Sequence, residues 1–249
     1  MDLELKGKRA VVLGASRGLG AAIARELAKE GAQVLGVSRN PDPDAPWASL
    51  AMDLASPDAA SAIFDHSRTE LGAVDVLVNN CGGPLPSAAV DTSGSDLLGA
   101  AQPMLATITD LARAVLPQMR ETGFGRIITL TSSGVREPIP GLAVSNKVRA
   151  ALHAWMKTLA KEVAMDGITV NMLMPGQIDT DRLRSLHSGR AEQMGIEPQQ
   201  MFDAAIANIP TGRFGEPHEF AAIAAFLAST RASYLTGLEI PVDGGFLRS

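Results

Sequence analysis

The chain has 249 residues, of which 46% are hydrophobic and 20% are charged, a balance typical of one soluble globular domain with a substantial core. Its net charge is −5 and it contains no basic tract, which argues against nucleic acid as a partner. Cys81 is the single cysteine, and no apolar run approaches the about 20 residues that span a bilayer, so we expect a cytoplasmic protein without disulfide, signal peptide or membrane anchor.

Short β-rich runs alternate with alanine-rich helical runs along the whole chain. The predicted strands are Arg9–Leu13, Gln33–Val37, Ser49–Met52, Val74–Val78, Arg126–Thr131, Ile168–Leu173 and Leu238–Val242. The predicted helices are Leu19–Glu30, Pro57–Leu71, Pro103–Glu121, Leu142–Met165 and Glu216–Ser229. This alternation, with nearly continuous apolar strands, predicts an α/β fold: a single domain over residues 1–249, with a doubly wound parallel sheet of the Rossmann type.

Two segments interrupt the alternation. Residues 40–47 form a loop rich in proline and aspartate, and residues 181–212 form a longer insertion with helical fragments and several glycines. Because the second insertion follows the carboxyl end of a strand, we expect it to act as a substrate lid. The alternative is a surface excursion with no functional part. The four histidines are scattered without ligand spacing, so no metal site is expected.

A glycine-rich turn lies between the first predicted strand and the first predicted helix. It reads Gly14-Ala-Ser16-Arg17-Gly18-Leu19-Gly20. Glycines let the backbone turn sharply and approach a phosphate, and the N–H groups at a helix start bind the anion. We therefore place these residues, Ala15 excepted, in a dinucleotide site.

The second strand runs into Ser38 and Arg39. NAD-binding Rossmann domains commonly carry an acidic residue here for the ribose 2′-hydroxyl, whereas an arginine favours a 2′-phosphate. Arg17 supplies a second cation. The sequence therefore predicts NADP(H), with Ser38 and Arg39 in its site. The alternative is that both arginines are solvated surface charges.

Further motifs extend over nearly the whole chain. In chain order, these motifs are Asp53-Leu54, Asn79-Asn80-Cys81-Gly82, Leu116-Pro117-Gln118-Met119, Pro175-Gly176-Gln177-Ile178-Asp179-Thr180 and Val242-Asp243-Gly244-Gly245. Together with the glycine turn, this series resembles the short-chain dehydrogenase/reductase family, in particular its 3-oxoacyl-[acyl-carrier-protein] reductase-like branch. The resemblance implies a homotetramer and adds cofactor contacts at Asp53, Leu54, Asn80, Gly82, Arg149, Pro175, Gly176, Ile178 and Thr180.

The resemblance also implies where the catalytic residues fall. Such reductases use a serine, a tyrosine, a lysine and an asparagine, and the serine matches Ser132. Ungapped counting puts Ser145 at the tyrosine position and Arg149 at the lysine position, and counting back from Leu116 puts Met104 at the asparagine position. A rival alignment that places Lys147 at the lysine position needs a deletion.

These substitutions change the chemistry that is expected. A serine hydroxyl is a far weaker acid than a phenol and reaches less far, and an arginine stays protonated. Arg149 can still bind the cofactor's ribose. Two nearby charged residues, Arg136 and Glu137, allow two interpretations. In the first, Arg136 holds an anionic or thioester substrate and Glu137 donates a proton. In the second, the two residues form a solvated ion pair on a turn.

The sequence therefore predicts an NADPH-dependent oxidoreductase with an atypical, tyrosine-independent site made of Ser132, Ser145 and Arg149. Its substrate is a small molecule or an acyl thioester with a carbonyl or an activated C=C bond. The alternative is a catalytically silent NADP-binding sensor, or the partner subunit of an active paralogue. A third hypothesis, a dehydrogenase that runs in the oxidative direction, fits Arg39 less well.

Overall fold

The computed structural model describes residues 2–247 and is built around one parallel sheet. The sheet has seven strands in the order β3-β2-β1-β4-β5-β6-β7. The strands are β1 (Arg9–Leu13), β2 (Gln33–Ser38), β3 (Ala48–Ala51), β4 (Val76–Asn79), β5 (Gly125–Leu130), β6 (Ile168–Pro175) and β7 (Glu239–Val242). The predicted fold class is confirmed, and each predicted strand is present with its ends shifted by a residue or two.

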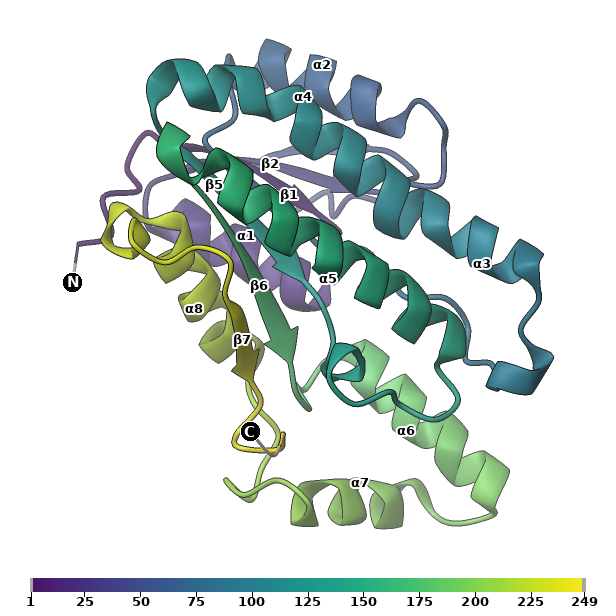
Figure 1. Ribbon diagram of the computed structural model, residues 1–249. Helices are drawn as coiled ribbons and strands as arrows, with labels where there is room; N and C mark the ends of the chain where they lie inside the picture. The colour runs from purple at the N-terminus through teal and green to yellow at the C-terminus, as the bar shows by residue number, and fades with distance from the viewer. Residues whose placement is uncertain (1, 248–249) are drawn as a thin grey trace.

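Helices cover both faces of the sheet (Figure 1). They are α1 (Gly18–Lys29), α2 (Ala59–Leu71), α3 (Gly94–Ala101), α4 (Thr107–Thr122), α5 (Ala143–Val163), α6 (Asp181–Met194), α7 (Pro198–Ala207) and α8 (Pro217–Ala228). One core layer joins the sheet to α2, α4 and α5, and a second joins it to α1 and α8. Burial on both faces explains why the strands are apolar almost throughout.

The helix predicted to begin at Pro103 begins earlier, and that prediction was wrong. Ser93 caps α3 in a reciprocal capping box with Asp96, and the helical path continues through a π-helical turn at Gln102–Ala106 into α4. Proline favours the first turn of a helix, which is why Pro103 suggested a start. Here it lies instead in the wide turn, where its missing N–H does not interrupt regular i to i−4 bonding.

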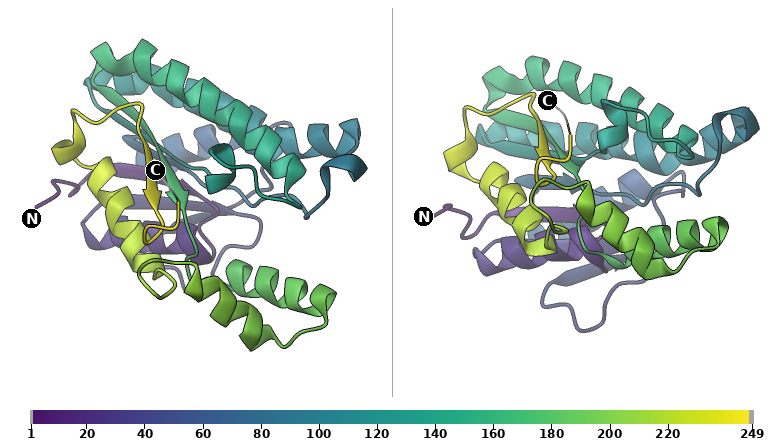
Figure 2. Two further views of the ribbon diagram at one scale, coloured as in Figure 1. Left: turned by 60° about the horizontal axis from the view of Figure 1, so that its bottom comes forward. Right: turned by 90° about the horizontal axis from the view of Figure 1, so that it is seen from below.

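The insertion 181–212 contains two helices, α6 and α7, beyond the carboxyl end of β6 (Figures 1 and 2). His187 and Ala191 are the buried residues of α6, and none of α7 is fully buried. No helix in the described part of the chain combines the length and the apolar character needed to cross a bilayer.

The sheet places a cleft at its carboxyl edge. β1 pairs with β2 on one side and with β4 on the other. Strands β2 and β3 are therefore added on one side of β1 and those from β4 to β7 on the opposite side. In open α/β sheets, ligands bind outside the strand ends at such a reversal. The loops that follow β1, β4, β5 and β6 all reach this edge and carry most of the expected site residues.

Candidate functional site

The glycine turn forms a tight cradle against Asn80. A Cβ atom built on Gly20 would lie 2.1 Å from the carbonyl oxygen of Gly14 and 2.6 Å from Nδ2 of Asn80. Nδ2 of Asn80 donates a hydrogen bond to that same carbonyl oxygen at 3.4 Å. Gly14 and Gly18 have positive φ angles of 66° and 59°. The loop therefore needs glycine at these positions, and it leaves room for a group that approaches the start of α1.

The segment after β6 lies on the other side of the glycine turn. A Cβ atom built on Gly18 would lie 3.8 Å from Cγ2 of Thr180. Thr180 caps α6, because its Oγ1 accepts a hydrogen bond from the backbone N–H of Leu183 at 3.3 Å. Gly176 is fixed against β7 by a hydrogen bond from its N–H to the carbonyl oxygen of Val242. Two sequence motifs far apart in the chain thus face each other across the switch point.

Two arginines beside this turn have free guanidinium groups. Arg17 and Arg39 are exposed, and neither side chain makes a hydrogen bond or an ion pair within residues 2–247. Trp47 closes the neighbouring loop: a Cβ atom built on Gly36 would lie 2.5 Å from its Nε1 and 3.0 Å from Cβ of Ala15. The glycine cradle and these unpaired cations fit the diphosphate and the additional phosphate of a dinucleotide.

Two further residues of the expected cofactor site are fixed by their own loop. Oδ1 of Asp53 accepts a hydrogen bond from the N–H of Ala55 at 3.0 Å. The carbonyl oxygen of Leu54 accepts one from Oγ1 of the buried Thr107 at 2.8 Å. The loop after β3 is thereby held to the start of α4. Gly82 lies in the loop after β4 and has open space where a side chain would stand.

Ser145 and Arg149 contact each other at the end of β5. Nε of Arg149 donates to Oγ of Ser145 at 3.3 Å, and Nη1 donates to the carbonyl oxygen of Leu130 at 2.8 Å. Oγ of Ser132, just beyond β5, accepts a hydrogen bond from the N–H of Gly134 at 3.1 Å. Both serine oxygens thus accept a hydrogen bond from the protein, which leaves both hydroxyl protons free to be donated to another group.

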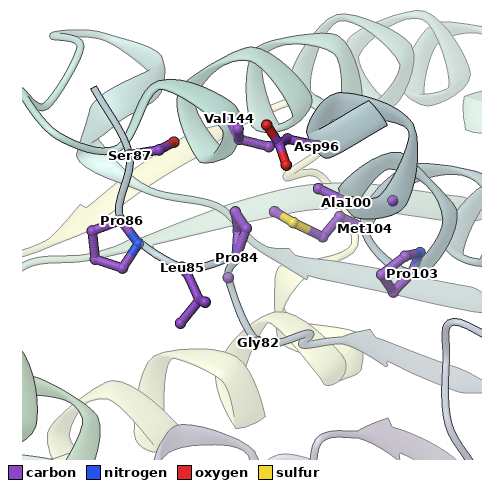
Figure 3. A pocket seen from close by; sticks show the side chains of 12 residues that line it. Gly82, Pro84, Leu85, Pro86, Ser87, Asp96, Ala100, Pro103, Met104 and Val144 are labelled. Carbon is purple, nitrogen blue, oxygen red and sulfur yellow. The ribbon is translucent and has the colours of Figure 1, made fainter. Parts of the chain in front are cut away.

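The space behind Ser145 is apolar. Met104 is 1% exposed and packs in a cluster with Ala100, Val144 and Val148. A cavity of about 380 Å³ opens between this cluster and the loop after β4. Figure 3 shows Met104 and Ala100 on one side of the cavity and Pro84 and Leu85 on the opposite side.

A second arginine, Arg182, reaches the same place, and the motifs described above do not include it. A Cβ atom built on Gly83 would lie 2.8 Å from Nη2 of Arg182 and 3.8 Å from Oγ of Ser145. Burial raises the pKa of the Cys81 thiol, while the charges of Arg149 and Arg182 act to lower it. Cys81 therefore stays a thiol at neutral pH, and its side chain packs against the core. The available signal for Arg182 was a cation in the first turn of a helix, where the dipole disfavours one.

Other expected residues lie elsewhere or are already paired. Arg136 is joined to β7, since its Nε donates to Oε2 of Glu239 at 3.2 Å, so it does not form the predicted pair with Glu137. Glu137 is exposed. Tyr234, the single tyrosine, is fully exposed and precedes β7 at the amino edge of the sheet, opposite to the cleft. It cannot reach Ser132 or Ser145 within one chain.

Comparison with known proteins identifies the family. A family model described as enoyl-(acyl carrier protein) reductase matches residues 14–247. The chain is 34% identical to the 3-oxoacyl-[acyl-carrier-protein] reductase FabG of Salmonella typhimurium, with 98% of each chain covered. The chain belongs to the short-chain dehydrogenase/reductase family.

Other members of the short-chain dehydrogenase/reductase family are equally similar over their full length. The NADPH-dependent reductase BacG of Bacillus subtilis is 32% identical over 97% of this chain and 98% of its own. The crystal structure of L-sorbose reductase from Gluconobacter frateurii, complexed with NADPH and L-sorbose, superimposes with a TM-score of 0.92 at 32% identity and covers 100% of both chains. The parallel sheet and its helical layers are thus those of the family.

Proposed function

We propose that this protein is an NADPH-dependent oxidoreductase that reduces a carbonyl or an activated C=C bond without a tyrosine as proton donor. One observation carries the proposal: at the carboxyl edge Arg149 donates to Ser145 and to Leu130, the last residue of β5 and two positions before Ser132, while the single tyrosine lies at the opposite edge. In this reading Ser145 and Arg149 replace the tyrosine and lysine of the family, and residues 181–212 form a lid over the substrate.

The cofactor that we propose is NADP(H). Its diphosphate would meet the glycine turn and the start of α1, and its 2′-phosphate would meet Arg17 and Arg39, which have no other partner in the described chain. The loop residues Asp53, Leu54, Asn80 and Gly82 and the segment from Pro175 to Thr180 would complete the site. The NADPH-dependent relative and the NADPH-bound L-sorbose reductase support this choice.

The residues of the chain supply an oxyanion site and not a proton relay. When bound, NADPH supplies the hydride that adds to a substrate carbon, and it leaves as NADP⁺. The hydroxyls of Ser132 and Ser145 donate hydrogen bonds to the substrate oxygen as negative charge develops on it. Arg149 positions Ser145 but stays protonated, so the proton that completes the reduction comes from water. Activated alkenes suit such a site, because an enolate held by the two serines can take its proton after the hydride has transferred.

A second function is favoured by the apolar surroundings of Met104. A catalytically silent NADP-binding sensor, or a partner subunit of an active paralogue, would need the cofactor site but no proton relay, and the side chains that form the cluster around Met104 are apolar. Such a protein would bind NADPH and never consume it when alone. Copurification with a related chain that carries tyrosine and lysine at these positions would support this alternative.

The test is NADPH oxidation over a panel of ketones, 3-oxoacyl thioesters, enoyl thioesters and enones. We expect turnover of at least one class, and a fall in kcat/KM of at least about 100-fold when Ser132→Ala and Arg149→Met are combined. The control pair, Ser61→Ala with Arg113→Met, removes an exposed hydroxyl and an exposed guanidinium and should leave kcat/KM unchanged. Unchanged turnover in the first pair would refute these roles, and no turnover at all would favour the silent protein.

Tighter binding of NADH than of NADPH in a fluorescence titration would end the cofactor proposal.

We also propose that the protein assembles as a homotetramer. The outer side of α5 carries exposed alanines at positions 150, 151 and 154, which permit the close approach of another helix. β7 lies at the edge of the sheet, and an edge strand in a soluble protein is commonly covered. A heteromer with an active paralogue would use the same two surfaces.

A further inference from the structure

Two guanidinium groups and one hydroxyl gather around Gly83. Nη2 of Arg182 and Oγ of Ser145 lie 2.8 Å and 3.8 Å from the position that a Cβ of Gly83 would occupy. Arg149 donates to that same hydroxyl at 3.3 Å. Any side chain at position 83 would displace Arg182, so the glycine keeps the space that this arginine fills. Gly83 also lines the cavity beside Met104, which places Arg182 at the cavity's edge.

Arg182 has no partner of opposite charge. Its guanidinium makes no hydrogen bond or ion pair with any described residue, whereas Arg184 in the same turn is bound by both carboxylate oxygens of Asp179, at 2.7 Å and 2.6 Å. Burial and the charge of Arg149 lower the pKa of Arg182, and no carboxylate acts on it. As the second residue of α6, it also faces the positive end of the helix dipole. Arg182 is exposed, so water screens these effects in part, but partial burial, the charge of Arg149 and the helix dipole all disfavour the cation, and an anion would offset all three.

We propose that Arg182 binds a free carboxylate of the substrate, next to the bond that is reduced. This inference rests on the proposed reductase function and narrows its substrate to oxo acids and unsaturated acids. A guanidinium matches a carboxylate through two parallel hydrogen bonds, which fixes the orientation of the acid as well as its charge. The position of Arg182 beside Ser145 requires that the anion lie within a few bonds of the reacting carbon.

The same geometry argues against the phosphate of a carrier-bound thioester as the anion that Arg182 binds. The phosphate of a pantetheine carrier stands at the far end of a long arm, whereas Arg182 stands beside the hydroxyl that meets the reacting group. The cavity next to it, about 380 Å³ in volume, has the size and the apolar lining of a pocket for the body of a small molecule. Asp96 lines it too, but its carboxylate is held by the N–H and hydroxyl of Ser93 at 2.9 Å and 2.6 Å.

The experiment compares an acid with its own methyl ester. 2-Oxo-4-phenylbut-3-enoate carries a ketone and an activated alkene next to a carboxylate, and the ester differs only in the lost charge. We expect kcat/KM to be at least about 100-fold higher for the acid than for the ester. Arg182→Gln should bring this ratio near one, mainly by lowering kcat/KM for the acid. Arg182→Lys, which keeps the charge without the fork, should retain part of the preference. The matched control is Arg190→Gln, about two turns along the same helix, which should leave the ratio unchanged.

Calorimetric titration of both compounds, with and without NADPH, separates this inference from the proposed function. If no compound is reduced but the acid binds more tightly than the ester in an Arg182-dependent way, the reductase proposal fails and the carboxylate site stands. Equal binding and equal turnover of acid and ester would overturn the inference, as would an unchanged preference in Arg182→Gln. Two other results would overturn it by giving Arg182 a different anion. One is a loss of NADPH affinity of more than about tenfold in Arg182→Gln, and the other is an Arg182-dependent preference for a phosphopantetheine thioester over an N-acetylcysteamine thioester.

Discussion

At the scale of single residues, the cofactor cradle depends on the absence of a side chain at position 20. We predict that Gly20→Ala lowers NADPH affinity by at least about 100-fold and destabilises the fold by about 1–3 kcal/mol, because its methyl group would overlap the backbone oxygen of Gly14. Fluorescence titration and urea unfolding measure the two effects. Gly189→Ala is the matched control: it lies within α6 with nothing near its Cβ position, so it should stabilise by about 0.5–1 kcal/mol. Intact NADPH binding in Gly20→Ala would contradict the proposed position of the diphosphate.

Sequence predicts such residues unequally. The glycine turn, Ser132 and Thr180 were accessible because each stands at a strand end or helix start, where residue type reports a local backbone need. Arg182 and Gly83 were not, because their importance lies in a contact between the loop after β4 and the first turn of α6, more than ninety positions apart in the chain. One of the two interpretations of Arg136 gave it a partner in its own loop, but the carboxylate that it binds comes from β7. Pairings of this kind depend on tertiary structure, which residue spacing does not encode.

At the scale of elements, one histidine fixes helix α6 to the rest of the site. Nε2 of the buried His187 lies 3.0 Å from Oε1 of Gln177 in the segment after β6. Its ring packs against Phe202 of α7 at 5.6 Å and Phe214 at 6.0 Å between centroids. The buried Nδ1 atom has no partner among the described residues. Helices α6 and α7 are therefore packed around an imidazole whose surroundings suit its neutral form.

Acid should therefore loosen α6. Burial, and then the charge of Arg190, lower the pKa of His187 below its usual 6.5. The unfolded chain then binds the proton more readily than the folded chain, so the free energy of unfolding falls as the pH drops through 6.5 towards the folded pKa, by no more than about 1.4 kcal/mol per pH unit. We predict that proteolysis within 181–212 speeds up between pH 7.5 and pH 5.5, and that His187→Gln removes most of that dependence. His66→Gln on α2 should keep it. Equal pH dependence in all three proteins would show that His187 is not the titrating group.

The elements themselves were predictable where burial imposed a pattern. The inner strands β1, β4, β5 and β6 are buried on both faces, so a largely apolar run marked each of them despite its short length, whereas the edge strands β3 and β7 are partly exposed. α3 was missed because glycine, serine and aspartate dominate its first turn, and its real signal was the Ser93–Asp96 capping box. Helices α6 and α7 show weak periodicity in the sequence, because they bury little of their surface and depend on contacts such as those of His187.

At the scale of the whole molecule, the proposed assembly leads to a prediction of mass. Size-exclusion chromatography with light scattering should give about four times the mass of one chain. Ala154→Arg, on the outer side of α5, should give a smaller species with unchanged circular dichroism, since a guanidinium there prevents close packing of two helices. Ala204→Arg, on the exposed side of α7, adds the same charge and should leave the mass unchanged. A monomeric protein at micromolar concentration would overturn the proposed tetramer.

The packing of Trp47 gives the molecule an internal optical probe. Its indole covers Gly36 and packs against the core layer that contains Ala15 of the glycine turn, whereas Trp155, the other tryptophan, packs against the core from α5 on the opposite face of the sheet. Replacing Trp155 with phenylalanine would leave a single emitter next to the region where an adenosine moiety would settle. Its emission would then follow occupation of that half of the cleft even by NADP⁺, whose oxidised nicotinamide neither fluoresces nor absorbs the tryptophan emission.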